Sequence, residues 1–130
     1  GRVLKEQGDL DGARHCYDRA LRIDEATYGR DHPNVARDAN NIGSVLHEQG
    51  DLDGARHYLD RALRIDEAAY GPDHPEVAID ANNIGGVLKE QGDRDGAREY
   101  FERAIRIFTD TYGPDNPWTQ ATKRNRDGLG

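Results

Sequence analysis

The 130-residue sequence predicts an all-α fold in which antiparallel helix pairs stack on one another. Two observations carry this prediction. A Gly- and Pro-containing phrase, YGxDxP, begins at Tyr28, Tyr70 and Tyr112, so it recurs every 42 residues. Between these phrases the apolar residues recur at helical spacing. A fixed period of about 20–50 residues is the signature of a repeat architecture, because each unit buries its apolar face only against its neighbours.

Three repeat units align without gaps, over residues 1–42, 43–84 and 85–126. The first two units are identical at 34 of 42 positions and the last two at 22 of 42. Most differences in the last unit fall between Phe108 and Arg126. The sequence therefore predicts a single array over residues 1–130 with an atypical C-terminal end.

The second half of a repeat, from Gly50 to Tyr70, predicts one helix. Gly50 favours a left-handed turn, and Asp51 can cap the helix that follows. The expected core stripe of this helix consists of Leu52, Ala55, Leu59, Ala62 and Ala69. The helix should end near Gly71, because Pro75 disfavours α-helical backbone at the residue before it.

The next stretch, from Pro75 to Gly92, predicts the other helix of the pair. Proline suits the first turn of a helix, where its missing N–H is not needed. The expected core stripe here consists of Ala78, Ala81, Ile84, Gly85 and Leu88. Each repeat is thus two antiparallel helices, joined by a short QGD turn and followed by a longer YGPDHP turn.

These residues resemble the tetratricopeptide repeat signature. The matching positions are Asn40, Gly43, Leu46, Gly50, Ala55, Leu59, Ala62 and Leu63, and again Asn82, Gly85, Leu88, Gly92, Ala97, Phe101, Ala104 and Ile105. The longer repeat, the GPDHP turn and the NN pair resemble the kinesin-light-chain subtype. The resemblance implies a right-handed α-solenoid whose first helices (helices A) line a concave groove, and a scaffold that binds a peptide or partner segment there. It also implies that residues 1–7 are the second half of a helix A.

A second stripe on the predicted helices A is a candidate binding surface. It contains Arg37, Asn40, Ser44 and His47, then Ile79, Asn82, Gly86 and Lys89, with Arg2 and Lys5 at the corresponding earlier positions. The 42-residue register predicts a ladder of Asn40 and Asn82. An amide both donates and accepts hydrogen bonds, which suits an extended peptide, and the resembled family uses such asparagines in this way. The alternative is that they are solvated polar residues, while Asn41 and Asn83 are expected to bond the backbone of a neighbouring turn.

The two ends of the array differ. In residues 117–126 four expected core positions become polar, as Thr119, Gln120, Lys123 and Arg126. This predicts a C-terminal capping helix, since a terminal repeat needs a polar outer face. The N-terminal end instead keeps the apolar residues of the internal repeat, at Val3, Leu4 and Leu10. They predict an alternative function, self-association through this face and homo-oligomers formed through the termini.

Composition disfavours several other functions. The net charge of −7 disfavours nucleic acid and anionic membranes as partners. No HExxH pair or phosphate-binding loop occurs, so neither an enzyme nor a metal or other cofactor is expected. Arginines that recur on the second helices (helices B) are expected to pair with carboxylates of the same helix. Cys16 is expected to be a small core residue, and its isolation favours a cytoplasmic location. The absence of methionine suggests a piece of a longer or processed protein.

Overall fold

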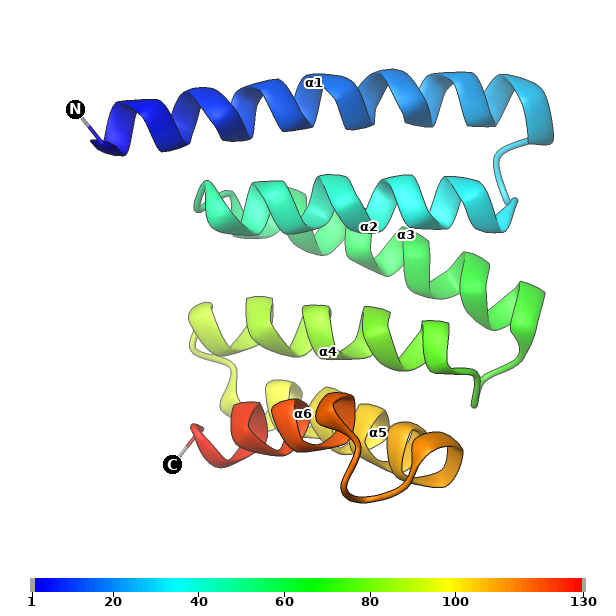
Figure 1. Cartoon of the computed structure of the whole chain (residues 1–130), viewed down its shortest axis with the longest axis vertical. Helices are drawn as coiled ribbons and strands as arrows, with labels where there is room; N and C mark the ends of the chain where they lie inside the picture. Colours follow the sequence, from blue (N-terminus) through cyan, green and yellow to red (C-terminus); the bar gives the residue numbers. More distant parts are fainter. Residues whose placement is uncertain (1, 130) are drawn as a thin grey trace. The chain divides into compact units, whose positions relative to one another are not determined.

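The computed structural model describes the backbone of residues 2–129 and the side chains of residues 8–129. The described chain is helical and contains no strand. Its helices, shown in Figure 1, are α1 (Arg2–Tyr28), α2 (Pro33–Glu48), α3 (Leu52–Tyr70), α4 (Pro75–Glu90), α5 (Arg94–Tyr112) and α6 (Pro117–Asp127). The predicted helix pairs of the second and third repeats are therefore confirmed, as α2 with α3 and α4 with α5.

The chain divides into two compact units, Gly1–Ile65 and Asp66–Gly130, with the boundary inside α3. In the first unit α1 packs against α2. In the second unit α4 packs against α5, and α5 packs against α6. Each unit thus contains helices that bury their apolar stripes against neighbours, because an amphipathic helix alone leaves its apolar stripe in water.

Two glycines bring a helix A into close contact with a helix B. A Cβ atom on Gly43 of α2 would lie 2.7 Å from Leu59 Cγ of α3. A Cβ atom on Gly85 of α4 would lie 2.6 Å from Phe101 Cε1 of α5. Real Cβ atoms do not approach other atoms so closely, so the two contacts require a residue without a side chain. The same contact occurs once in each unit.

The core confirms most of the predicted apolar stripes. The fully buried apolar side chains with the largest volumes are Phe101, Phe108, Ile42, Leu46, Leu59, Ile84, Ile107, Val35, Val77 and Val87. In α3 the predicted core residues Ala55, Leu59 and Ala62 have no exposed surface. Ala69 is exposed and Leu52 is half-buried, so these two predictions were wrong. Both lie in the terminal turns of α3, beyond its tightly packed middle.

Helices A begin at the prolines Pro33, Pro75 and Pro117, as predicted. The residue before each proline caps the helix through its side chain. His32 Nδ1 accepts a hydrogen bond from the Asn34 amide at 3.1 Å, and His74 Nδ1 accepts from the Glu76 amide at 3.1 Å. These bonds require Nδ1 to carry no proton. Before α6 the histidine is replaced by Asn116, whose Oδ1 accepts a hydrogen bond from the Trp118 amide at 2.9 Å.

The short turns before α3 and α5 are capped by aspartate, as the sequence predicted. Gly50 has a φ of 85°, and Asp51 Oδ1 accepts from the Gly54 amide at 3.0 Å. Asp93 makes the corresponding bond to the Gly96 amide at 2.9 Å. Helix B therefore starts at the equivalent position in both complete repeats, Leu52 in α3 and Arg94 in α5.

The first repeat departs from this pattern. The expected QGD turn at Gly8 does not form, because α1 continues through it from Arg2 to Tyr28. Local helix propagation prevails over the turn. Cys16 of α1 is exposed, so its predicted core role was wrong.

Gly85→Ala should lower the free energy of unfolding by about 1–3 kcal/mol, since the new methyl group would overlap Phe101. Gly12→Ala is the matched control, because a Cβ there meets nothing within 4 Å. The control should be more stable than the wild type by roughly 0.5–1 kcal/mol, owing to helix propensity alone. Urea unfolding measures both. Equal effects of the two substitutions would refute the close-contact account.

His74→Ala should destabilise the protein by about 1 kcal/mol, because it removes the acceptor that caps α4. His74→Asn should cost less, since Asn116 provides the same acceptor for α6. Thermal unfolding at pH 7.5 compares the two variants. A loss for asparagine as large as that for alanine would show that His74 acts through its ring stacking on Tyr70, at a centroid distance of 4.4 Å, and not through the cap.

Candidate functional site

The predicted stripe on α2 lies outside the core of the first unit. Arg37 is exposed, and Asn40, Ser44 and His47 are half-buried. The residues that alternate with them on the other face, Ala36, Ala39, Ile42, Gly43 and Leu46, are buried. The side chains of Arg2 and Lys5, which the prediction added to this stripe, lie outside the described residues.

The equivalent stripe on α4 is joined by α6 in the second unit. Lys89 is exposed, and Ile79, Asn82 and Gly86 are half-buried. Asn125 of α6 donates a hydrogen bond from Nδ2 to Asn82 Oδ1 at 3.1 Å. Asn82 therefore has an amide partner on the next helix A. The predicted ladder with Asn40 concerns two different units and stays a prediction.

Arg124 of α6 is a further candidate that the sequence reasoning missed. It is exposed and occupies the position 42 residues after Asn82. The same register that relates Asn40 to Asn82 would have found it, but the sequence of α6 differs too much from the other repeats to invite the comparison. Asn125, the residue that contacts Asn82, is the counterpart of Asn83.

The charged residues of this stripe are all basic, although the chain carries a net charge of −7. They are Arg37, Lys89 and Arg124. Neither Lys89 nor Arg124 forms an ion pair with a carboxylate of the described residues. Several arginines of the helices B are instead paired with carboxylates. Arg14, Arg56, Arg61, Arg98, Arg103 and Arg106 all lie within 4 Å of a carboxylate oxygen.

Some of these helix B pairs are intrahelical, as predicted, but others are not. Arg56 pairs with Asp60 of its own helix at 3.1 Å. Arg61 of α3 instead contacts Glu25 of α1 at 3.5 Å, and Arg103 of α5 contacts Glu67 of α3 at 3.0 Å. The intrahelical prediction was wrong for these two, because their helices pack beside the end of the preceding helix B. It was also wrong for Arg106 of α5, which contacts Asp73 of the turn between α3 and α4 at 3.1 Å.

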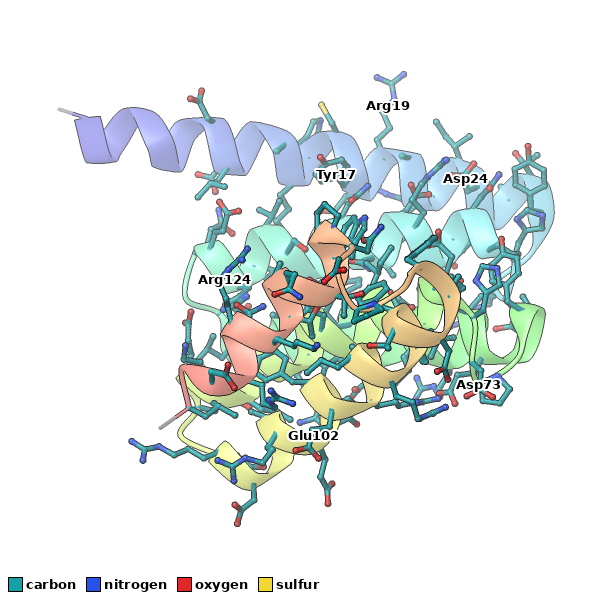
Figure 2. The ribbon with its side chains drawn as sticks, turned by 60° about the horizontal axis from the view of Figure 1, so that its bottom comes forward. Tyr17, Arg19, Asp24, Asp73, Glu102 and Arg124 are labelled. Carbon is teal, nitrogen blue, oxygen red and sulfur yellow. The ribbon has the colours of Figure 1, made fainter. Side chains whose placement is uncertain are left out.

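Arg61 and Arg103 also form hydrogen bonds to the backbone of the turns that precede α2 and α4. Arg61 donates to the carbonyl oxygen of Arg30 at 3.2 Å, and Arg103 donates to that of Pro72 at 3.2 Å. In the last repeat the equivalent carbonyl, that of Pro114, accepts from Gln120 Nε2 at 2.6 Å. The third turn is thus held from within its own repeat. Arg19, the counterpart in α1, is exposed and extends away from α2 (Figure 2).

The helix over residues 117–126 packs against α5, as a cap would. The four polar residues that were predicted to form its solvent-exposed outer face are not fully exposed. Thr119 is fully buried and donates through Oγ1 to the carbonyl of Gly113 at 2.9 Å, so its expected exposure was wrong. The hydroxyl satisfies its hydrogen bond locally, which lets it replace Val77 inside the core. Gln120, Lys123 and Arg126 are half-buried. That α6 ends the array stays a prediction.

Two pairs of aspartates lie between successive helices, and three of the four residues are buried while Asp24 is half-buried. Asp38 of α2 is hydrogen-bonded to Asp24 of α1, which lies on the α2 side of its helix (Figure 2). Asp80 of α4 is hydrogen-bonded to Asp66 of α3. Asp38, Asp66 and Asp80 are only 3%, 4% and 1% exposed, far less than surface carboxylates. The sequence reasoning placed none of them in the core.

Burial is the main cause of the raised pKa values in these pairs. It raises the pKa of Asp38 to about 7, helped by the hydrogen bond and the charge of Asp24 and opposed by Arg37. Burial also raises the pKa of Asp66, while the hydrogen bond from Asp80 and the neighbouring His74 oppose the rise. A neutral carboxylic acid is therefore favoured in each pair.

Other kinds of site find no support in the described part of the chain. Residues 8–129 bring together no group of three His, Cys, Asp or Glu side chains that could hold a metal ion. Within residues 2–129, no helix combines the length and apolar character that a membrane span requires. Val3 and Leu4 of the predicted self-association face lie outside the described side chains, and Leu10 is half-buried.

Comparison with known proteins decides the family. The tetratricopeptide repeat family model matches residues 1–68, 38–110 and 80–126, so its matches span nearly the whole chain. The chain belongs to the tetratricopeptide repeat (TPR) family. TPRs generally mediate protein–protein interaction. A comparison with the curated proteins gave no match.

Two solved structures share the fold of this TPR chain. The crystal structure of BtubC (BKLC) from P. vanneervenii is 25% identical, with a TM-score of 0.85. A Podosopora anserina kinesin light chain with nearly identical TPR-like repeats is 16% identical, also with a TM-score of 0.85. The alignments cover 98% of this chain but only 51% and 61% of those chains. The predicted class, an all-α solenoid of TPR helix pairs, is confirmed.

Proposed function

We propose that this TPR chain is an interaction scaffold that binds an extended, acidic segment of a partner protein along the exposed stripe of its helices A. One observation carries the proposal. Lys89 and Arg124 are exposed and without a carboxylate partner among the described residues, and they occur on the helices that hold the Asn82–Asn125 amide pair. In a chain of net charge −7, two exposed basic groups on the same two helices as an amide pair favour an anionic ligand there.

The chemistry of the stripe supports a peptide over a small anion. Asn82 and Asn125 share one hydrogen bond, which leaves further donors and acceptors on both amides for a peptide backbone. Lysine and arginine supply donors for aspartate or glutamate side chains. The first unit carries the equivalent residues on α2, which are Arg37, Asn40, Ser44 and His47.

The alternative function, self-association through Val3, Leu4 and Leu10, stays a prediction. The exposed Arg19 would accompany such a face, because its counterparts Arg61 and Arg103 hold the turn of a preceding repeat. The third turn of a second copy offers little to Arg19, since Gln120 already bonds its carbonyl and Thr109 replaces the glutamate. This disfavours head-to-tail pairing of copies.

The double substitution Lys89→Glu/Arg124→Glu should weaken binding of an acidic peptide roughly tenfold or more, because it replaces attraction by repulsion. The probe is a fluorescein-labelled pool of Asp/Glu-rich peptides, compared with the same peptides carrying Asn/Gln. Fluorescence anisotropy measures the affinities at low and high salt.

Arg94→Glu/Arg98→Glu on α5 is the matched control, since it makes the same change in net charge on a helix B. It should alter affinity less than about threefold at moderate salt, where distant charges are screened. Equal losses in the two double variants would mean that net charge alone governs binding. Equal affinity of the wild type for the acidic and the amidated peptides would refute an acidic ligand.

Asn82→Ala should weaken binding of the same peptides roughly threefold to tenfold, corresponding to the loss of one or two hydrogen bonds. Its effect should persist at high salt, unlike that of the charge reversals, because an amide contact is not screened. Asn83→Ala provides the comparison at the neighbouring position. If Asn82→Ala leaves the affinity unchanged, the amide pair has no part in binding.

A further inference from the structure

The two aspartate pairs occupy the same place in successive repeats. Asp24 and Asp38 join α1 to α2, and Asp66 and Asp80, each 42 residues later, join α3 to α4. Each pair links the helix B of one repeat to the helix A of the next. The two pairs lie in different units, and each is complete within its own unit.

A hydrogen bond between two carboxyl groups requires a proton on one of them, because two carboxylates have only acceptors. The surroundings of Asp38 also favour the protonated form. Its Oδ2 atom is buried and has no hydrogen-bond partner among the described residues. A bare oxygen is far less costly on a neutral acid than on an anion, whose charge needs several donors or a counter-ion.

The last repeat provides a comparison within the same chain. Phe108 and Thr122 occupy the positions that Asp66 and Asp80 hold one repeat earlier, and both are fully buried. Thr122 donates through Oγ1 to the carbonyl of Trp118 at 2.8 Å, within its own helix. The junction of α5 and α6 therefore packs at the same place without a titratable group.

We propose that each aspartate pair is a proton-sharing joint that holds a helix B to the following helix A when one carboxyl is protonated and loosens when that proton leaves. Deprotonation would put two negative charges at hydrogen-bond distance inside the protein, where water screens them poorly. Arg37 acts on the first pair and His74 on the second, and each favours the deprotonated carboxylate. The inference needs no partner and is independent of the proposed function.

The direction of the pH effect follows from the two protonation states. Asp38 has a pKa of about 7 in the folded protein, against an ordinary value of 3.8. The folded state then binds more protons between these values, so stability must fall as the pH rises through that range. The contribution of the joint is fully present below about pH 4 and is lost as the pH passes 7.

Carbon-detected NMR of the full chain tests the first step directly. The side-chain carboxyl signal of Asp38 should show a titration step near pH 7, well above the ordinary value of 3.8. Amides of α2 and α4 should also exchange faster at pH 8.5 than the base-catalysed rate alone predicts, while those of α6 should not. If every carboxyl of both pairs titrates near pH 4, the inference is overturned, whatever any variant does.

Substitution tests the second step. Asp38→Asn supplies a neutral amide donor to Asp24, so it should retain the bond and remove the pH dependence at this joint. Between pH 6 and 8.5 the Tm of the wild type should fall, and that of Asp38→Asn/Asp80→Asn should stay nearly flat. Asp60→Asn, on the surface beside Arg56, is the control and should keep the slope of the wild type. A double variant that falls with pH as steeply as the wild type would contradict the joint.

Discussion

The contact between a helix A glycine and a bulky helix B side chain is the constraint on which the other features depend. Gly43 against Leu59 and Gly85 against Phe101 leave no room for a Cβ atom, so each helix A can present only one face to its partner. The rotation of α2 and α4 about their axes is thereby fixed. Asn40 and Asn82, three residues before these glycines, then lie about 60° around the helix from them, at the edge of the core face, where they are half-buried.

The turns fix the second variable, the point at which each helix begins. Proline sets the first helical residue, and the preceding His32, His74 or Asn116 supplies the capping acceptor. Arg61 and Arg103 then tie the turn of one repeat to the helix B of the next. Because start and rotation are both fixed, residues 42 positions apart perform equivalent tasks. The aspartate pairs and the asparagine stripe both follow from this register.

Helix existence and boundaries in the complete repeats could be predicted from the sequence, since glycine, proline and aspartate act locally. The course of α1 could not, because the turn at Gly8 depends on packing and not on local preference. The exposure of Cys16 has the same origin. Asp38 and Asp80 were missed because charge suggests a surface position, and only the partner carboxyl on another helix makes burial tolerable.

In the candidate site too, some features could be predicted from the sequence and others depend on how the helices pack. Spacing alone separated Asn40 and Asn82 from the core face. It did not find the bond from Asn125 to Asn82, which depends on how α6 docks. The absence of a carboxylate beside Lys89 and Arg124 was also beyond the sequence, because glutamates and aspartates are close to both in the chain and only the fold decides which of them pair.

The central claim is that the basic stripe of the helices A binds an acidic segment, and amide chemical-shift mapping on the full chain tests it most directly. Addition of an Asp/Glu-rich peptide to the ¹⁵N-labelled protein should shift the signals of Asn82, Lys89, Arg124 and Asn125 in a saturable way, with smaller changes on α3 and α5. Shifts confined to α3 and α5, or none on α4 and α6 at saturating peptide, would contradict the claim.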